Sequence, residues 1–306
     1  MPLPLFACVF CLLLNSIVFA RDTNIGFSGM AQMDANRYLV VMDKKSHHTG
    51  ARLGIFSLHA QKKPSFTSLT VNEWKHPDGQ ASDLESVCKL PNSINQYLVS
   101  ESGYWKGRNG RIFHITVENV SVTVNTVYML PLYQSNDEEM TGDNFEGLLC
   151  VAHRNDIWVI LGERGGSSLY PSGKLRPGKL LSANDIIKWY APEQFAIDVT
   201  PQGSWTNKKG YRSISDLYLD DNGMVWASAT EDKGDLGPFN SLIWSIGYLQ
   251  IADENVAIKP AQQKSWQITG LKVEALAGPA ALAPESIMSM GSEDEDLGGV
   301  WRPLLP

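Results

Sequence analysis

The chain has 306 residues, a formal net charge of −7 and an isoelectric point near 5.4. Acidic residues outnumber basic ones and no segment is rich in Lys and Arg, so the composition argues against nucleic acid as a partner. Apolar residues make up 43% of the chain and nine residues are Trp, which is enough for one large core, and all-β domains often reach this size undivided.

The chain begins with an apolar segment that has no charged side chain through residue 20. Arg21 and Asp22 then open a polar stretch, and Val18 and Ala20 are small enough for the positions that a signal peptidase reads. We therefore expect a signal peptide over residues 1–20, a single domain over residues 21–306, a secreted or periplasmic protein, and no stable membrane insertion after cleavage. The alternative is a retained membrane anchor, because the apolar run is near the shortest length that spans a bilayer.

A short phrase then returns five times, each time followed by a strand that ends on a carboxylate. The second copy is residues 84–87 followed by residues 97–101, and the third is residues 145–148 followed by residues 157–163. A repeat of about 60 residues with this layout is typical of a β-propeller. The anchors of the five copies are Ser28, Glu85, Glu146, Ser215 and Glu274.

Each repeat divides into short runs of β-branched and aromatic residues, separated by Gly, Asn, Asp and Pro, as in an antiparallel meander. The second repeat predicts strands over residues 84–89, 96–101, 111–117 and 120–130. The predicted fold is all-β, a single propeller of five blades with about four antiparallel strands per blade. A sixth blade hidden between the third and fourth anchors is the alternative.

Two further expectations concern the longer and the shorter repeats. Residues 182–190 predict a short helix inserted between outer strands and capped by Ser182 or Asn184. Few residues follow Glu274, so the last blade is short of strands, and residues 21–27 are placed to lend it one.

Cys88 and Cys150 are the cysteines that remain after the signal peptide is removed. They follow Glu85 and Glu146 by three and four residues, on the expected inner strands of neighbouring blades. A disulfide between blades and two buried free thiols are both compatible with this placement.

The repeated carboxylates are expected to share one rim of the propeller, because the first strand of a blade leaves the face to which the second returns. The inner set, at the channel mouth, is Glu85, Glu146, Asp216 and Glu274. The outer set is Asp43, Glu101, Glu163, Glu231 and Glu293. Crowded carboxylates repel one another unless a cation neutralises them, and Ca²⁺ is the hard cation that suits oxygen ligands. We therefore predict Ca²⁺ at the inner set; the alternative is that these acids cap backbone N–H groups.

Basic residues follow several of these acids within a few positions. Arg108, Arg111 and Arg164 are the candidates for binding an anionic substrate. The alternative is that each base pairs with the acid of its own blade, as a structural ion pair repeated with the fold.

The motifs of the second and third repeats resemble those of the phytase-like, or esterase-like, β-propeller proteins. The phrase Asp83-Leu84-Glu85-Ser86-Val87, the strand that ends at Glu101, Arg111-Ile112 and Phe145-Glu146-Gly147-Leu148 are similar to that family's pattern. The resemblance implies a secreted protein with phosphatase or esterase activity and Ca²⁺ on an acidic face. The residues that match the family's site positions are Glu85 and Glu146 by motif and Asp216 and Glu274 by their place in the repeat. Glu101 and Glu163 match the positions behind them. Ser28 and Ser215 depart from the family's pattern because they lack the carboxylate.

The sequence therefore leaves two main hypotheses, and it does not decide whether the protein is an enzyme. The first is a monomeric Ca²⁺-dependent phosphoester or ester hydrolase for a small anionic or ester substrate, in which Glu101 or Glu163 is the general base. The second is a non-catalytic propeller stabilised by Ca²⁺ that binds a protein or a glycan. A lactonase, similar to the gluconolactonase propellers, is a third and smaller alternative.

Overall fold

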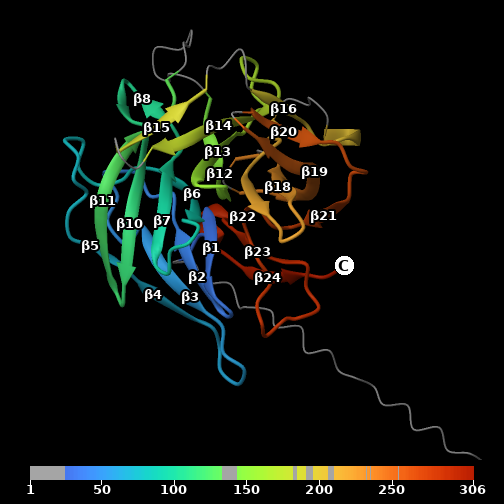
Figure 1. Ribbon diagram of the computed structural model, residues 1–306. Helices are drawn as coiled ribbons and strands as arrows, with labels where there is room; N and C mark the ends of the chain where they lie inside the picture. The colour runs from blue at the N-terminus through green and yellow to red at the C-terminus, as the bar shows by residue number, and fades with distance from the viewer. Residues whose placement is uncertain are drawn as a thin grey trace, which may run out of the picture.

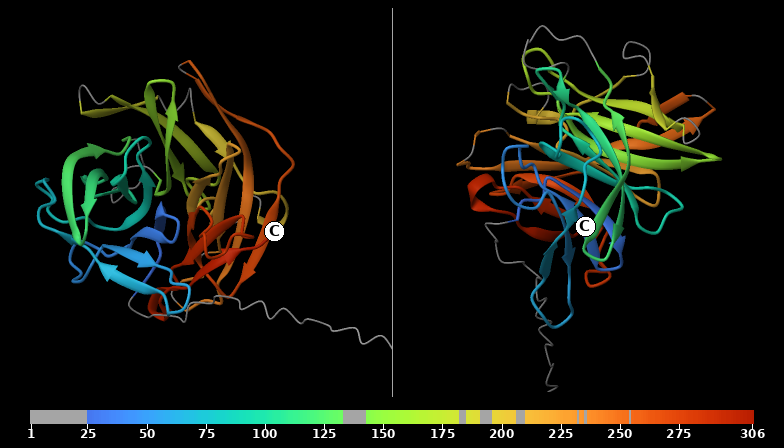
Figure 2. Two further views of the ribbon diagram at one scale, coloured as in Figure 1. Left: turned by 60° about the horizontal axis from the view of Figure 1, so that its bottom comes forward. Right: turned by 90° about the vertical axis from the view of Figure 1, so that its left-hand side faces the viewer.

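A computed structural model of the chain describes residues 25–132, 143–181, 185–190, 196–205, 210–231, 233–234, 236–253 and 255–306. These residues form five sheets that stand around a central axis as the blades of a propeller (Figures 1 and 2). The predicted five-bladed fold is thus confirmed. The predicted signal peptide lies outside the described residues.

Blades 1 and 2 are built from the first third of the chain. Blade 1 is β1 (Gly29–Asp34), β2 (Arg37–Val41), β3 (Leu53–Ser57) and β4 (Ser65–Ser68), paired in that order. Blade 2 is β6 (Leu84–Lys89), β7 (Gln96–Glu101), β10 (Arg111–Glu118) and β11 (Ser121–Met129), with β5 (Thr70–Val71) added in parallel outside β11. β8 (Tyr104–Trp105) and β9 (Arg108–Asn109) form a separate small ribbon. The four strands predicted for the second repeat are all present, with ends that differ by one residue at most.

Blades 3 and 4 follow the same order, and each has one extra strand on its third strand. Blade 3 is β12 (Phe145–His153), β13 (Asp156–Glu163), β14 (Gly173–Leu181) and β15 (Ile186–Trp189), with β16 (Ile197–Val199) also on β14. Blade 4 is β17 (Asp216–Leu219), β18 (Met224–Thr230), β19 (Asn240–Ala252) and β20 (Asn255–Lys259), with β21 (Ser265–Thr269) also on β19. A 3₁₀ turn, η1 (Gly203–Trp205), lies between them.

The helix predicted over residues 182–190 was wrong where the structure describes it. Ile186–Trp189 is the strand β15, paired antiparallel with β14. Its side chains alternate between exposed and buried positions, with Ile187 facing the core. This two-residue alternation and the available edge of β14 favour a strand over an isolated helical turn. Residues 182–184, which contain both proposed caps, lie outside the described residues.

Blade 5 has three strands in the part of the chain that the structure describes: β22 (Val273–Ala277), β23 (Met288–Ser292) and β24 (Trp301–Leu304). A 3₁₀ turn, η2 (Glu295–Leu297), joins the last two. Residues 25–27, the described part of the segment expected to lend this blade a strand, form no strand; the backbone N–H of Phe27 instead donates to the carbonyl of Ser292, 3.2 Å away. Residues 21–24 lie outside the described residues.

The inner strands β1, β6, β12, β17 and β22 contact one another in that order, and β22 contacts β1, so the ring is closed (Figure 2, left). Closure between blades 5 and 1 uses side chains as well as backbone hydrogen bonds, such as that from the N–H of Ala281 to the carbonyl of Ala35 (2.7 Å). Phe27, Tyr38, Phe56 and Trp301 form one buried apolar cluster, and the hydroxyls of Tyr38 and Ser289 are 2.9 Å apart. Burial of such large aromatic side chains is the dominant favourable contribution at a seam of this kind.

The second strand of each blade is covered on both faces by neighbouring blades. Tyr97, Leu98 and Val99 of β7 are consecutive and all fully buried. Strands buried on both faces are continuous apolar runs, which explains why the sequence pattern of the second strands was easy to find. In the described residues no helix is long and apolar enough to cross a membrane.

Candidate functional site

Three glutamates hold equivalent places at the start of the inner strands. Glu85, Glu146 and Glu274 each fall at a shift in the register between the first and second strands of their blade, as in a β-bulge. A bulge re-aims the side chain of the inserted residue and is frequent beside functional sites. Glu85, Glu146 and Glu274 interact electrostatically with one another, and Asp216 interacts with Glu146 and Glu274. Three of the four predicted inner acids thus hold one equivalent position on the inner strands of their blades, and their role as metal ligands stays a prediction.

Asp216 differs from them by one position. It pairs with Ser228 in the register in which Ser86 pairs with Ser100, so Ser215 is the true counterpart of Glu85. Its two carboxylate oxygens accept hydrogen bonds from the backbone N–H groups of Leu217 (2.8 Å) and Leu276 (2.7 Å). Asp216 thus ties blade 4 to blade 5, as in the alternative in which a channel acid caps backbone groups.

The five acids predicted for the outer set do not share one position. Glu101 and Glu163 come one residue after the paired residues Ser100 and Gly162 of their second strands. In blades 1 and 5 the corresponding acids, Asp43 and Glu293, come two residues after the paired residue of the second strand. In blade 4 the acid, Glu231, comes three residues after it. A shift of one residue turns a side chain to the other face of a strand. The five acids of the outer set therefore do not all point to the same face.

Glu101 and Arg111 form an ion pair with no exposed side-chain surface. The guanidinium of Arg111 donates to both oxygens of Glu101, at 2.5 and 2.9 Å. The backbone N–H groups of Ser82 (2.8 Å) and Arg111 (2.9 Å) complete the set. Both oxygens of Glu101 therefore accept their hydrogen bonds from this network. The pair is the structural ion pair that the sequence analysis gave as the alternative to substrate binding by Arg111.

Glu163 has the same role in blade 3. Its carboxylate is buried and accepts hydrogen bonds from the Nε and Nη2 atoms of Arg176 on β14. The two predicted general bases therefore lie in closed ion pairs within their blades. Catalysis by Glu101 or Glu163 stays a prediction.

The three predicted substrate-binding arginines occupy three different environments. Arg111 is buried as described, and Arg108 lies in the β8–β9 ribbon, two-thirds exposed, where it pairs with Asp78 at 3.3 Å. Arg164 directly follows β13 and lies at the mouth. Its Nη1 atom is 3.5 Å from Glu146, and its Nε atom is 4.0 Å from Asp143.

Two basic side chains that the sequence reasoning missed accompany Glu274. The ammonium of Lys272 is 3.1 Å from Glu274 and 3.4 Å from Glu293, and Arg212 is 3.5 Å from Glu274. Across the mouth, Lys45 pairs with the buried carboxylate of Asp83. Lys272 and Arg212 precede their inner-strand anchors by two and three residues, whereas the predicted basic residues follow the second strands of their blades. A basic residue shortly before an anchor is the sequence signal that marks these two.

Glu85 is the exception among the three glutamates. Within the part of the chain that the structure describes, its side chain forms no hydrogen bond and no ion pair, although it is buried. Burial first, and then the nearby charges of Glu146 and Asp83, raise the pKa of Glu85 well above its ordinary value of 4.5. Both causes favour the protonated form of this carboxyl group.

Burial raises the pKa of other carboxyl groups at the mouth in the same direction. The pKa of Glu274 rises to about 8, opposed by its basic neighbours Lys272 and Arg212, and that of Glu293 to about 7. That of Asp143 rises to about 6 despite the backbone N–H of Gly165. The mouth thus holds several carboxyl groups that exchange protons near neutral pH, a feature typical of functional sites.

Two more polar atoms beside Glu146 lack a hydrogen-bond partner in the described structure. They are Oδ1 of Asn144 and Nε of Arg164, and both are buried. Buried polar atoms are nearly always satisfied, so each exception calls for an explanation such as a ligand. These two atoms leave hydrogen-bonding capacity unused beside Glu146, as do buried atoms elsewhere in the described residues, among them Oγ of Ser228 and Nε1 of Trp301.

The predicted Ca²⁺ ligands are not assembled as a ligand group. In the described residues no group of three or more His, Cys, Asp or Glu side chains is placed to hold a metal ion. Glu146 and Glu274 have basic neighbours, and Asp216 binds backbone N–H groups, although oxygen donors as such suit Ca²⁺. Ca²⁺ binding stays a prediction.

Comparisons with known proteins give no family assignment: no family model matches the sequence, and no curated protein matches it. Solved structures share the general fold. A putative oxidoreductase (glucose dehydrogenase) from Thermus thermophilus is 10% identical, with 94% of this chain and 98% of that chain covered and a TM-score of 0.44. A β-fructofuranosidase of family GH32 from Bombyx mori is 9% identical, with 94% and 61% covered and a TM-score of 0.41. The Dos1 propeller is 10% identical, with 90% and 70% covered and a TM-score of 0.36. Likeness at this level has no bearing on activity.

Proposed function

We propose that the protein is a secreted hydrolase of phosphoester or carboxylester substrates, with its active site at the channel mouth between blades 2 and 3. The observation that supports it most is Glu85, a buried carboxyl group with a raised pKa and without a partner among the described residues. The resemblance to the phytase-like propellers supports it as well, because Glu85 and Glu146 stand in the two motifs that are most similar to that family's.

The two glutamates divide the proton transfers of a hydrolysis between them. Glu85 in its protonated form donates a proton to the leaving oxygen, and Glu146, ion-paired with Arg164, accepts one from the attacking water. Two carboxyl groups whose environments differ in this way are the usual arrangement for paired acid and base roles. No proton transfer in this scheme uses a metal ion.

Arg164 is the proposed anchor for the anionic part of the substrate. Its guanidinium donates no hydrogen bond within the described structure, and its Nε atom is buried. Guanidinium groups form strong, two-pronged hydrogen bonds with phosphate and carboxylate oxygens. Arg164 therefore replaces Arg108 and Arg111 as the best-placed of the three predicted substrate-binding residues.

Secretion is part of the proposal, and the bond between Cys88 and Cys150 supports it. The two sulfur atoms are joined in the structure, which selects the disulfide from the two alternatives left by the sequence. Disulfides persist in secreted and periplasmic proteins and are rare in reducing compartments.

A second candidate is a non-catalytic propeller, stabilised by Ca²⁺, that binds a protein or a glycan. Asp216, Glu101 and Glu163 favour it, because the repeated acids at these positions all make structural contacts. In that case the carboxyl group of Glu85 would take a cation at high pH and a proton at low pH.

One experiment separates the two candidates. The purified secreted form is melted with EDTA and with added Ca²⁺, and turnover of p-nitrophenyl phosphate and p-nitrophenyl acetate is measured in the same buffers. Turnover supports the hydrolase, and its persistence in EDTA supports the metal-free proton transfers. A rise in melting temperature with Ca²⁺ and no turnover supports the binding propeller, since a ligand that binds the native state stabilises it.

A further inference from the structure

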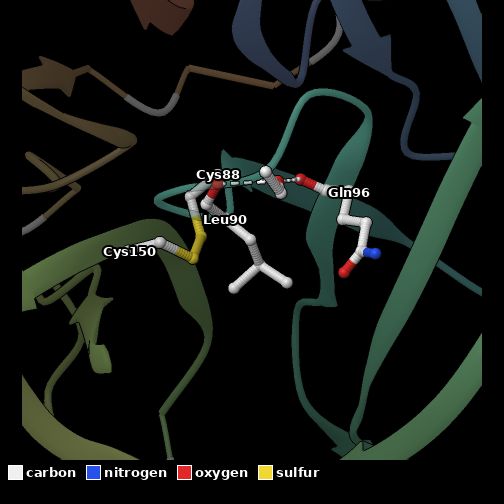
Figure 3. The surroundings of a disulfide bond; sticks show 5 residues. Cys88, Leu90, Gln96 and Cys150 are labelled. Atoms are coloured by element: carbon white, nitrogen blue, oxygen red, sulfur yellow. Dashed lines mark hydrogen bonds between the residues drawn. A yellow bond between two sulfur atoms is a disulfide. The ribbon is translucent and has the colours of Figure 1, made fainter. Parts of the chain in front are cut away.

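The disulfide joins the two inner strands that hold Glu85 and Glu146. Cys88 lies on β6 and Cys150 on β12, with their Cα atoms 5.6 Å apart (Figure 3). Cys88 is three residues beyond Glu85 and Cys150 four beyond Glu146, which is about 10 and about 13 Å along a strand. In the described residues this is the one covalent bond between side chains of neighbouring blades, since it uses both cysteines that they contain.

The bond also lines a cavity at the other end of the channel from the glutamates. The cavity has a volume of about 240 Å³ and is bordered by residues of all five inner strands, among them Cys88, Cys150, Lys89 and Tyr218. Cys88 is 7% exposed, and Cys150 is half-buried.

The rest of the seam is held by contacts without covalent bonds. Leu98, Phe145 and Leu148 belong to the apolar cluster in which Cys88 is buried, and the backbone N–H of Phe145 donates to the carbonyl of Ser102. These contacts keep the blades together, but packed side chains allow small shifts that a covalent bond forbids. The separation of β6 and β12 thus depends on the disulfide more directly than on any single contact.

We propose that the Cys88–Cys150 disulfide is a positioning element of the active site: it fixes β6 against β12 and so holds Glu85 at the working distance from Glu146. This inference rests on the proposed function for its catalytic consequence, and on geometry alone for the strand positions. A proton donor and acceptor must be placed within a few tenths of an ångström for efficient transfer, so a small shift lowers the rate.

The same bond makes the site sensitive to a dithiol reductant. A thiolate of the dithiol attacks one cysteine sulfur and releases the other as a thiol, and the second thiolate then resolves the mixed disulfide. The protein gains two electrons and two protons as Cys88 and Cys150 become thiols, and the reductant becomes a disulfide. The reduced protein keeps its blades but loses the fixed distance between the two glutamate strands.

Hydrogen exchange measured by mass spectrometry tests the strand positions without any assay of activity. Oxidised protein, protein reduced with dithiothreitol, and the double variant Cys88→Ser/Cys150→Ser are compared. Exchange over residues 84–88 and 146–150 should be about tenfold faster in the reduced protein and in the variant, while residues 273–277 of β22 stay within about twofold. Dithiothreitol should not change the variant further. Unchanged exchange in the first two segments, or an equal rise in β22, would overturn the proposal.

Steady-state kinetics test the catalytic consequence. With an alkyl phosphate, whose leaving oxygen needs the proton of Glu85, reduction should lower kcat about tenfold and leave KM within about twofold, and reoxidation should restore kcat. Equal loss in KM and kcat, or no loss, would contradict a positioning role. If the oxidised protein shows no turnover, the proposed function fails, but the exchange measurement still decides the strand positions.

Discussion

Glu85 and Glu146 stand in the same bulged position on adjacent inner strands, but they have different partners. Arg164 lies 3.5 Å from Glu146, whereas Glu85 has no hydrogen bond or ion pair in the described structure. Two carboxyl groups with the same backbone setting thus differ because the residue after the second strand is Arg164 in blade 3 and Ser102 in blade 2. Ser102 donates its hydroxyl to Asp83, 2.6 Å away, and supplies no cation to Glu85.

The raised pKa of Glu85 predicts a stability that falls as pH rises. Below its ordinary value of 4.5 the group is protonated in both the folded and the unfolded chain and contributes nothing. Above that value the unfolded chain releases the proton that the folded chain retains, so the free energy of unfolding decreases until the folded pKa is passed. Urea unfolding from about pH 5 to about pH 9 should show a smaller decrease in Glu85→Gln than in the wild type. Identical pH profiles would show that Glu85 titrates normally.

Removal of one member of the buried Glu101–Arg111 pair should be strongly destabilising. In Arg111→Met the carboxylate of Glu101 remains buried without its guanidinium, and this should lower the free energy of unfolding by about 3–5 kcal/mol. Arg108→Met is the matched control: its pair with Asp78 is largely exposed, so we expect a change below about 1 kcal/mol. Urea unfolding at neutral pH measures both. A small loss in Arg111→Met would mean that Glu101 finds solvent or another donor.

The disulfide should also contribute to global stability. It closes a loop with a sequence separation of 62 residues, for which chain entropy predicts about 4 kcal/mol of stabilisation. Cys88→Ser/Cys150→Ser should therefore unfold at a lower urea concentration under oxidising conditions, and the reduced wild type should match it. A wild type that unfolds identically before and after reduction would show that the bond does not constrain the unfolded chain.

Arg164→Met should weaken the binding of anionic substrates. A hydrogen bond to a charged group is worth about 1.5–3 kcal/mol, so KM for p-nitrophenyl phosphate should rise about tenfold or more. The neutral p-nitrophenyl acetate should show a smaller rise, and Arg108→Met should leave both substrates unchanged. An equal effect of Arg164→Met on the two substrates would remove the guanidinium from anion recognition.

The repeat was sufficient to predict the blades, because the buried first and second strands are continuous apolar runs with a fixed order. The residue-level site was only partly predictable. The bulges at Glu85 and Glu146 arise from pairing with the second strand, and a one-residue shift in that pairing separates Glu101 from Asp43 in space although they align by eye.

The partners of the acids were the least predictable feature. Arg176 reaches Glu163 from the third strand of its blade, and Lys272 reaches Glu274 from the segment before its own strand. Both pairs satisfy a buried charge, and any basic residue within reach does so, whatever its place in the repeat. The short strand β15 was not predicted for a related reason. Its four residues form a strand because they pair with the edge of β14, and this pairing is not visible in the sequence.

The dependence of turnover on the leaving group tests the role of Glu85 most directly. An alkyl ester or alkyl phosphate needs a proton on its leaving oxygen, whereas p-nitrophenolate leaves without one. Glu85→Gln should therefore lower kcat about 100-fold for the alkyl substrate and have little effect on the p-nitrophenyl substrate, while Glu118→Gln on the exposed end of β10 changes neither. An equal loss on both substrates, or none on either, would contradict the assignment of Glu85 as the proton donor.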